Sequence, residues 1–147
     1  MRIRLVTAIV LSALLLVACG QPTPLRVRFE PNGAPLTGIS AEKLAASTDI
    51  GPVAAVAVDK APAVRAEMLK QLRADGPAGE RAAQLLTTGF PTATASVPIL
   101  VRDCSFEGTS AVIVVEAFGD ATGKLTHRRL WVFGAASGDV MRAASFR

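Results

Sequence analysis

Four apolar segments in the carboxyl-terminal half of the chain decide the fold, and they read VPILVRDCSF (97–106), AVIVVEAF (111–118), LTHRRLWVF (125–133) and VMRAASF (140–146). Each is seven to ten residues long and rich in the β-branched and aromatic side chains that favour strands. Glycine-containing linkers of four to six residues separate the segments, and glycine supplies the positive φ that tight turns need. The pattern predicts a four-stranded antiparallel meander in which each strand pairs with the next.

Two amphipathic segments precede this meander. The first is expected to begin near Asp59 and to end at the Gly-Pro pair at 76–77, and the second to run from about Gly79 until Gly89. We interpret the apolar side of the first segment as core packing against the sheet, not as a ligand groove. That side consists of Val64, Met68, Leu69 and Leu72, with Arg65, Glu67, Lys70 and Arg73 placed elsewhere on the helix. The expected fold class is α+β, with a two-helix hairpin covering one face of the four-stranded antiparallel sheet.

The part of the chain before residue 59 gives weaker signals. Residues 25–29 alternate apolar and charged side chains, which is typical of a short edge strand that stops at the Pro-Asn-Gly turn of 31–33. Ser40 is a candidate N-cap for a short helix over residues 40–46. Residues 53–58 are apolar without a decisive period, so they could form a strand or an extended lead into the next helix.

The amino terminus has the order of a signal peptide. Arg2 and Arg4 precede an uncharged, mostly apolar run over residues 5–18, which is the arrangement of a basic region followed by a hydrophobic one. As a helix, this run would be about 21 Å long, short of the roughly 30 Å of a bilayer's hydrocarbon core. We therefore expect a signal helix that is cleaved, not a permanent transmembrane helix.

The end of this run, Leu16-Val17-Ala18-Cys19, resembles the lipobox of bacterial lipoproteins. The resemblance implies that a peptidase cuts between Ala18 and Cys19, and that the Cys19 thiol carries a diacylglycerol through a thioether. Two acyl chains suffice for stable anchoring where one is marginal. The alternative is an ordinary secretory signal whose cleavage site happens to lie near a cysteine.

The lipobox resemblance also implies a location and a division of the chain. Residues 1–18 would be the lipoprotein signal peptide, residues 19–38 the lipidated cysteine and a tether with a candidate edge strand, and residues 39–147 a single small α+β domain. We expect the protein at the extracytoplasmic face of the cell membrane, with membrane lipid as its partner through acylated Cys19. The tether segment 20–24, if extended, spans on the order of 15 Å, so the domain would stay close to the bilayer.

The charge of the chain is nearly balanced once the signal peptide is removed. Without Arg2 and Arg4, 14 basic side chains remain against 12 acidic ones. Nucleic-acid binding relies on concentrated cations that displace counterions, so no nucleic-acid partner is expected. No cofactor is expected either, because the chain has no phosphate loop or dinucleotide fingerprint.

Few residues could carry chemistry. His127 is the single histidine, and no cysteine or carboxylate cluster has the spacing of metal ligands, so no metal site is predicted. No nucleophile elbow occurs and no pair of carboxylates in one cleft can be nominated, so no catalytic residue is assigned and we expect a protein that is not an enzyme. With Cys19 lipidated, Cys104 is interpreted as a small buried apolar side chain; an intermolecular disulfide or a reactive thiol is the alternative.

The most polar interruption of the predicted sheet lies at residues 126–129. If Phe118 faces Leu125 across the turn, Glu116 faces His127 and the two form a local charge pair. One interpretation is an exposed strand end with ordinary cross-strand ion pairs, and the other is a contact patch for anionic headgroups or a partner's acidic surface. The candidate contact patch consists of His127, Arg128, Arg129 and Trp131.

Two further resemblances concern the mature chain. Residues 129–140, RLWVFGAASGDV, resemble the strand-turn-strand ending of PepSY-type extracytoplasmic domains, in which an aspartate commonly stands where this chain has Gly134. In its abundance of alanine, arginine, glycine and valine, the chain resembles small uncharacterised lipoproteins of high-GC Gram-positive bacteria.

Together these observations predict a lipid-anchored envelope protein without enzymatic activity, one that binds or modulates another membrane or secreted protein. The alternative is a small-ligand binder with an apolar pocket between helices and sheet, in the manner of cystatin-like or NTF2-like folds. A sizeable apolar cavity near Trp131 would favour the ligand binder. A hydrolase with His127 beside a serine or a carboxylate is the third hypothesis.

Overall fold

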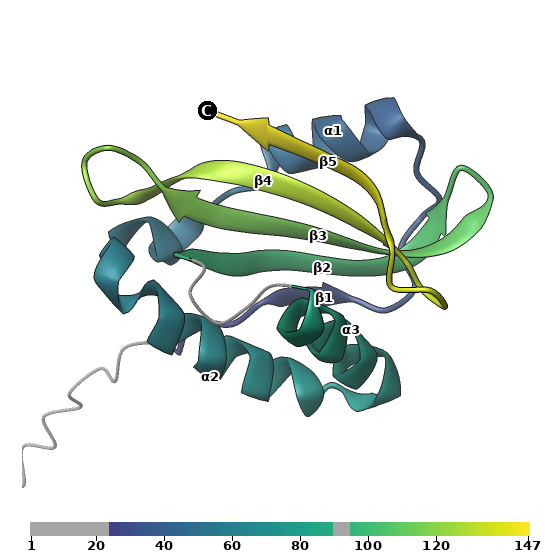
Figure 1. The fold of residues 1–147 in the computed structure, drawn as a ribbon, viewed down its shortest axis with the longest axis horizontal. Helices are drawn as coiled ribbons and strands as arrows, with labels where there is room; N and C mark the ends of the chain where they lie inside the picture. Colours follow the sequence, from purple (N-terminus) through teal and green to yellow (C-terminus); the bar gives the residue numbers. More distant parts are fainter. Residues whose placement is uncertain (1–23, 90–94) are drawn as a thin grey trace, which may run out of the picture.

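The computed structural model describes residues 24–89 and 95–147, in which helices lie on both sides of one five-stranded sheet (Figure 1). The strands lie side by side in the order β1 to β5, with β1 parallel to β2 and all other neighbours antiparallel. Their bounds are β1 (Arg28–Glu30), β2 (Ser96–Phe106), β3 (Thr109–Gly119), β4 (Leu125–Gly134) and β5 (Val140–Phe146). The predicted meander is confirmed as β2 to β5, and the sheet gains a fifth strand, the edge strand indicated by residues 25–29.

In the described part of the chain, three α-helices accompany the sheet, and two short 3-10 helices connect the first to the second. The bounds are α1 (Gly38–Ser47), η1 (Gly51–Ala55), η2 (Val58–Lys60), α2 (Ala61–Arg73) and α3 (Gly76–Thr88). The expected helix hairpin is present as α2 and α3. The expectation for residues 53–58 was wrong, because most of this segment belongs to η1 and to the start of η2.

Two helix starts differ from the expectation, each for a local reason. Thr37, not Ser40, caps α1: the Thr37 hydroxyl accepts from the Ser40 N–H at 3.3 Å, and the Ser40 hydroxyl accepts from the Thr37 N–H at 2.7 Å. Gly76 has a φ of 89° and turns the chain between α2 and α3. Pro77 lies in the first turn of α3, where a missing N–H costs no hydrogen bond. The Gly-Pro pair therefore begins α3 instead of only ending α2.

Both faces of the sheet are covered, which corrects the expectation of one covered face. Every residue of β3 from 111 to 117 is buried, and successive strand residues point to opposite faces. On one face, Arg65 of α2 bonds Glu116 of β3. On the other, Arg128 of β4 bonds the carbonyl oxygen of Thr48, the C-cap of α1. The hairpin of α2 and α3 thus packs on one face and α1 on the other, as Figure 1 shows.

The core lies on both sides of β3. The largest fully buried side chains include Phe133, Met68, Leu72, Leu86, Leu100 and Ile113. Within residues 24–89 and 95–147, no helix is both long and apolar enough to cross a bilayer. The segment proposed as a signal peptide, Cys19 and most of the tether lie outside the described residues.

Gly79 permits the close approach of α3 to the end of α2. A Cβ atom at Gly79 would lie 2.2 Å from the carbonyl oxygen of Leu72. We expect Gly79→Ala to lower the free energy of unfolding by about 1–3 kcal/mol through overpacking, although alanine is the better helix former. Urea unfolding of the variant measures this, with exposed Glu80→Ala in the same helix as the control. Equal or higher stability of Gly79→Ala would contradict the close contact.

Candidate functional site

A buried ion pair joins the helix hairpin to the sheet. Glu116 on β3 is fully buried, and Arg65 on α2 is 6% exposed. The Nη1 group of Arg65 donates to Oε1 of Glu116. The second carboxylate oxygen, Oε2, accepts from the Ser96 hydroxyl at 3.2 Å and from the Trp131 indole N–H at 3.1 Å. Both oxygens of this buried carboxylate are therefore hydrogen-bonded.

The Arg65 guanidinium also reaches the backbone of two other elements. Its Nη1 lies 3.3 Å from the Ser96 carbonyl oxygen on β2, and its Nη2 donates to the Leu86 carbonyl oxygen on α3 at 3.2 Å. The Leu86 carbonyl lies in the last turn of α3, where carbonyls lack partners within the helix. One side chain of α2 thus connects α3, β2 and β3. This network is suited to fixing the position of the hairpin on the sheet.

Sequence reasoning assigned Arg65 to the polar side of its helix, and this was wrong. Ala61, Arg65, Met68 and Leu72 are all buried along α2, at the spacing of three to four residues that marks one helix face. The signal was present in the sequence, because Arg65 stands on the same stripe as Met68 and Leu72. A charged residue in that stripe indicates a buried partner, and only the fold identifies the partner as Glu116.

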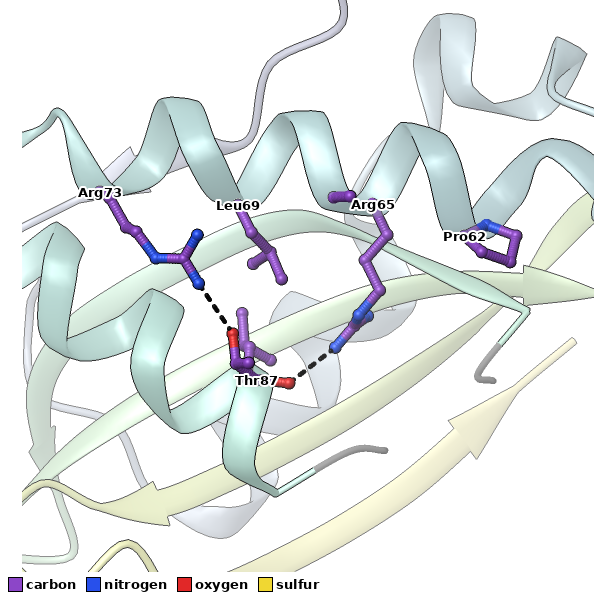
Figure 2. Close-up of a pocket in the computed structure, with 7 residues that line it drawn as sticks. Pro62, Arg65, Leu69, Arg73 and Thr87 are labelled. Carbon is purple, nitrogen blue, oxygen red and sulfur yellow. Dashed lines mark hydrogen bonds between the residues drawn. The ribbon is translucent and has the colours of Figure 1, made fainter. Parts of the chain in front are cut away.

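A cavity of about 290 Å³ lies between α2 and α3 (Figure 2). Arg65 and Arg73 reach across it from α2 with Leu69 between them, and the Arg73 Nη2 donates to the Thr87 hydroxyl at 3.1 Å. The lining comprises Pro62, Arg65, Ala66, Leu69, Arg73, Leu86 and Thr87. Its volume is at the lower end of the range of small-molecule sites. Since Glu116 compensates the charge of Arg65, Arg73 and Thr87 are the groups suited to contact a polar end of a small molecule.

This cavity differs from the pocket that the sequence suggested. The expected pocket lay between the helices and the sheet near Trp131, whereas the lining of this cavity comes from α2 and α3 alone. The indole N–H of Trp131 is committed to Glu116. The ligand site that this cavity offers is therefore a groove of the hairpin.

The structure divides the predicted contact patch between the two faces of the sheet. Arg128 points to the α1 face, where its Nε donates to the Thr48 carbonyl oxygen at 2.6 Å. Successive residues of a strand point to opposite faces. The opposite face, which carries α2 and α3, therefore receives the side chains of His127, Arg129 and Trp131. The expectation that all four side chains form one surface was wrong, because neighbouring residues of a strand cannot share a face.

The expected pairing of Glu116 with His127 was also wrong. Phe118 pairs with His127 and Glu116 with Arg129, two residues away from the expected register, and an irregularity follows Phe118. The Arg129 guanidinium lies 4.4 Å from the centre of the Phe118 ring, a cation–π contact. His127 meets the same ring edge-on, with centroids 5.4 Å apart. These residues form an aromatic and cationic cluster at the end of β3 and the start of β4.

Two other titratable groups have clear structural roles. Burial raises the pKa of the Cys104 thiol, so this free cysteine stays protonated and poorly nucleophilic near neutral pH. The burial agrees with the interpretation of Cys104 as a small core side chain.

Hydrogen bonds from the hydroxyls of Thr122 and Thr126 lower the pKa of Asp120, whose carboxylate closes the turn between β3 and β4. Among the described residues, no three His, Cys, Asp or Glu side chains gather closely enough to hold a metal ion.

Comparison of the chain with protein-family models, with curated proteins and with solved structures finds no match.

The Arg65–Glu116 pair can be tested with a double-mutant cycle. Glu116→Gln alone leaves the Arg65 charge buried without compensation, and Arg65→Met alone does the same to Glu116, so each should cost about 3–5 kcal/mol of unfolding free energy. The double variant removes both charges while the glutamine carbonyl still accepts from Trp131. We expect it to lose less than the two single losses combined, with a coupling of about 1–3 kcal/mol.

Urea unfolding of the four proteins measures this coupling. Arg73→Met, which removes an exposed guanidinium from the same helix, serves as the control and should change stability by no more than about 0.5 kcal/mol. Strict additivity of the two single losses would contradict a direct ion pair.

Proposed function

We propose that this chain is a lipid-anchored extracytoplasmic protein of the cell envelope, whose domain binds another envelope protein and catalyses no reaction. The anchor rests on the lipobox-like sequence that ends at Cys19. The role of the buried polar groups supports a binding domain, because Glu116 and Arg65 are occupied with each other and with neighbouring elements. Their mutual contacts are those of a structural ion pair, and the fully buried Glu116 is not placed to contact a substrate.

The observation that carries the proposed interaction is the exposed edge strand β5. Within the described residues, β5 pairs only with β4, and five of its seven residues are exposed. Val140 is 53% exposed and Met141 is 42% exposed. An edge strand presents unpaired backbone N–H and C=O groups that can add a strand from another chain. The opposite edge, β1, has only three residues, which gives a partner strand little to pair with.

The first helix extends this apolar edge. Arg142 of β5 donates from its Nε to Glu42 of α1 at 3.0 Å, so the amino-terminal half of α1 lies beside β5. Ile39 stands one turn before Glu42 and is 72% exposed. Ile39, Val140 and Met141 are the large apolar side chains that are exposed in the described residues. Two of the three belong to the open strand β5, which favours an extended segment of a partner protein as the occupant.

A second candidate function is the binding of a small amphiphilic molecule in the cavity between α2 and α3. The observation that favours it is the combination of the apolar Leu69 and Leu86 side chains with the Arg73 guanidinium in one cavity of about 290 Å³. Ala66 lines the cavity and is itself exposed. A bulkier residue at this position would therefore fill the cavity without disturbing the core.

The anchor is tested by changing Cys19. We expect Cys19→Ala to abolish incorporation of a labelled fatty acid and to keep residues 1–18 attached, because the variant lacks the thiol that carries the lipid and, in the lipoproteins that the chain resembles, the peptidase cuts before a lipidated cysteine. Labelling of cells followed by mass analysis of the protein gives the result, with Cys104→Ala as the control that keeps the thiol at Cys19. Incorporation of the label into Cys19→Ala would overturn the lipid anchor.

The partner surface is tested by photo-cross-linking in intact cells. A photoreactive phenylalanine analogue at Val140 should yield a protein adduct of defined mass, whereas the same analogue at exposed Lys70 on α2 should not. In the chain that carries the analogue at Val140, Met141→Lys combined with Ala143→Lys, both at exposed positions of β5, should lower the adduct yield at least several-fold, since charged edges resist strand addition. Ala66→Phe separates the two candidate functions, because it should leave the adduct intact. Loss of the adduct with Ala66→Phe but not with the β5 variant would favour the cavity.

A further inference from the structure

The largest of the cavities described lies on the α1 side of the sheet, where the chain first enters the domain. Its volume is about 650 Å³, and it is formed between residues 24–28 and the segment from Thr48 to Val53 that follows α1. Leu25, Ile50, Pro52 and Ile99 supply apolar walls. This groove shares no residue with the cavity between α2 and α3.

Two exposed arginines stand in this groove. Arg26 and Arg28 both line it and both are exposed. Arg28 forms an ion pair with Glu30 at 3.2 Å, and Glu30 also binds Arg102. Because two guanidinium groups share this one carboxylate, Glu30 does not neutralise both of them. The single acidic residue in the lining, Asp49, accepts the N–H of Gly51 in a local turn. In the described residues, Arg26 has no acidic partner, and the groove has a positive balance.

If Cys19 carries the lipid, the short tether keeps this groove within reach of the membrane. Five peptide steps separate Cys19 from Pro24, the first described residue of the lining. A fully extended chain advances at most about 3.6 Å per residue, so Pro24 lies no more than about 18 Å from the cysteine that would carry the lipid. A surface held at that distance meets the headgroups of the same leaflet.

We propose that this groove binds the headgroup of an anionic phospholipid in the leaflet that holds Cys19. The phosphate would lie at Arg26 and Arg28, and Leu25, Ile50 and Pro52 would contact the glycerol and upper acyl region. Arginine binds phosphate through paired N–H donors, and basic residues at an anionic surface gain attraction within a Debye length. The inference rests on the proposed anchor, since the tether supplies the proximity.

Hydrogen exchange of the full lipidated protein in nanodiscs tests the site. In nanodiscs that contain phosphatidylglycerol mixed with phosphatidylcholine, we expect the backbone amides of residues 49–51 and 53 to exchange several-fold more slowly than in phosphatidylcholine alone. Arg26→Glu combined with Arg28→Glu should abolish this difference. Lys70→Glu combined with Arg81→Glu, which makes the same change of net charge on α2 and α3, should preserve it.

Three results would overturn the headgroup site. The first is equal exchange in the two kinds of nanodisc, and the second is loss of protection in the Lys70 and Arg81 control. The third is the same protection in phosphatidylcholine nanodiscs after addition of inorganic phosphate, which would indicate a site for a soluble anion. The anchor is judged separately, by whether Cys19→Ala loses the labelled fatty acid, so failure of the groove and failure of the anchor are distinguishable.

Discussion

The ion pair between Arg65 and Glu116 is the constraint on which the arrangement of this domain depends. A buried ion pair contributes little more to the free energy of unfolding than well-packed apolar side chains of the same volume would. An arrangement of the helices that buried one of the two charges without its partner would, however, be strongly disfavoured. Here the pair also engages Ser96, Trp131 and the Leu86 carbonyl, so it is satisfied only when four elements besides α2 are in place. The network therefore favours one position of the hairpin on the sheet over other positions that would bury similar apolar area.

Helices cover both faces of the sheet, so the candidate binding surfaces lie at its edge and in grooves away from its faces. The α2 and α3 hairpin and α1 bury the central strand β3 on both sides, which removes the sheet faces there as binding surfaces. The surfaces that stay accessible in the described residues include the edge strand β5, the groove between the two hairpin helices and the groove at the entrance of the chain. The proposed roles follow this division, with a protein partner at β5 and lipid at the tether.

Much of the secondary structure could be predicted because it depends on local patterns. The four meander strands begin and end within two residues of the expected positions, since apolar runs and glycine turns are local features of the sequence. The helix pair was also found, with the error at Gly76 and Pro77 arising because the same residues can end one helix and begin the next. Residues 53–58 lacked a period, and without one, propensity alone does not identify 3-10 turns.

The sequence by itself determined the order of helices and strands, the α+β class and the signal-like amino terminus that ends at Cys19, because each is encoded in contiguous residues. Only the tertiary structure decided that Arg65 meets Glu116 across 51 residues of sequence, that Arg128 leaves the predicted patch and that α1 covers the second face. The physical reason is that strand register and helix placement depend on contacts between distant segments. A shift of two residues in the register of β3 and β4 leaves each side chain on the same face of the sheet but changes its cross-strand neighbour, so that Glu116 lies opposite Arg129 instead of His127.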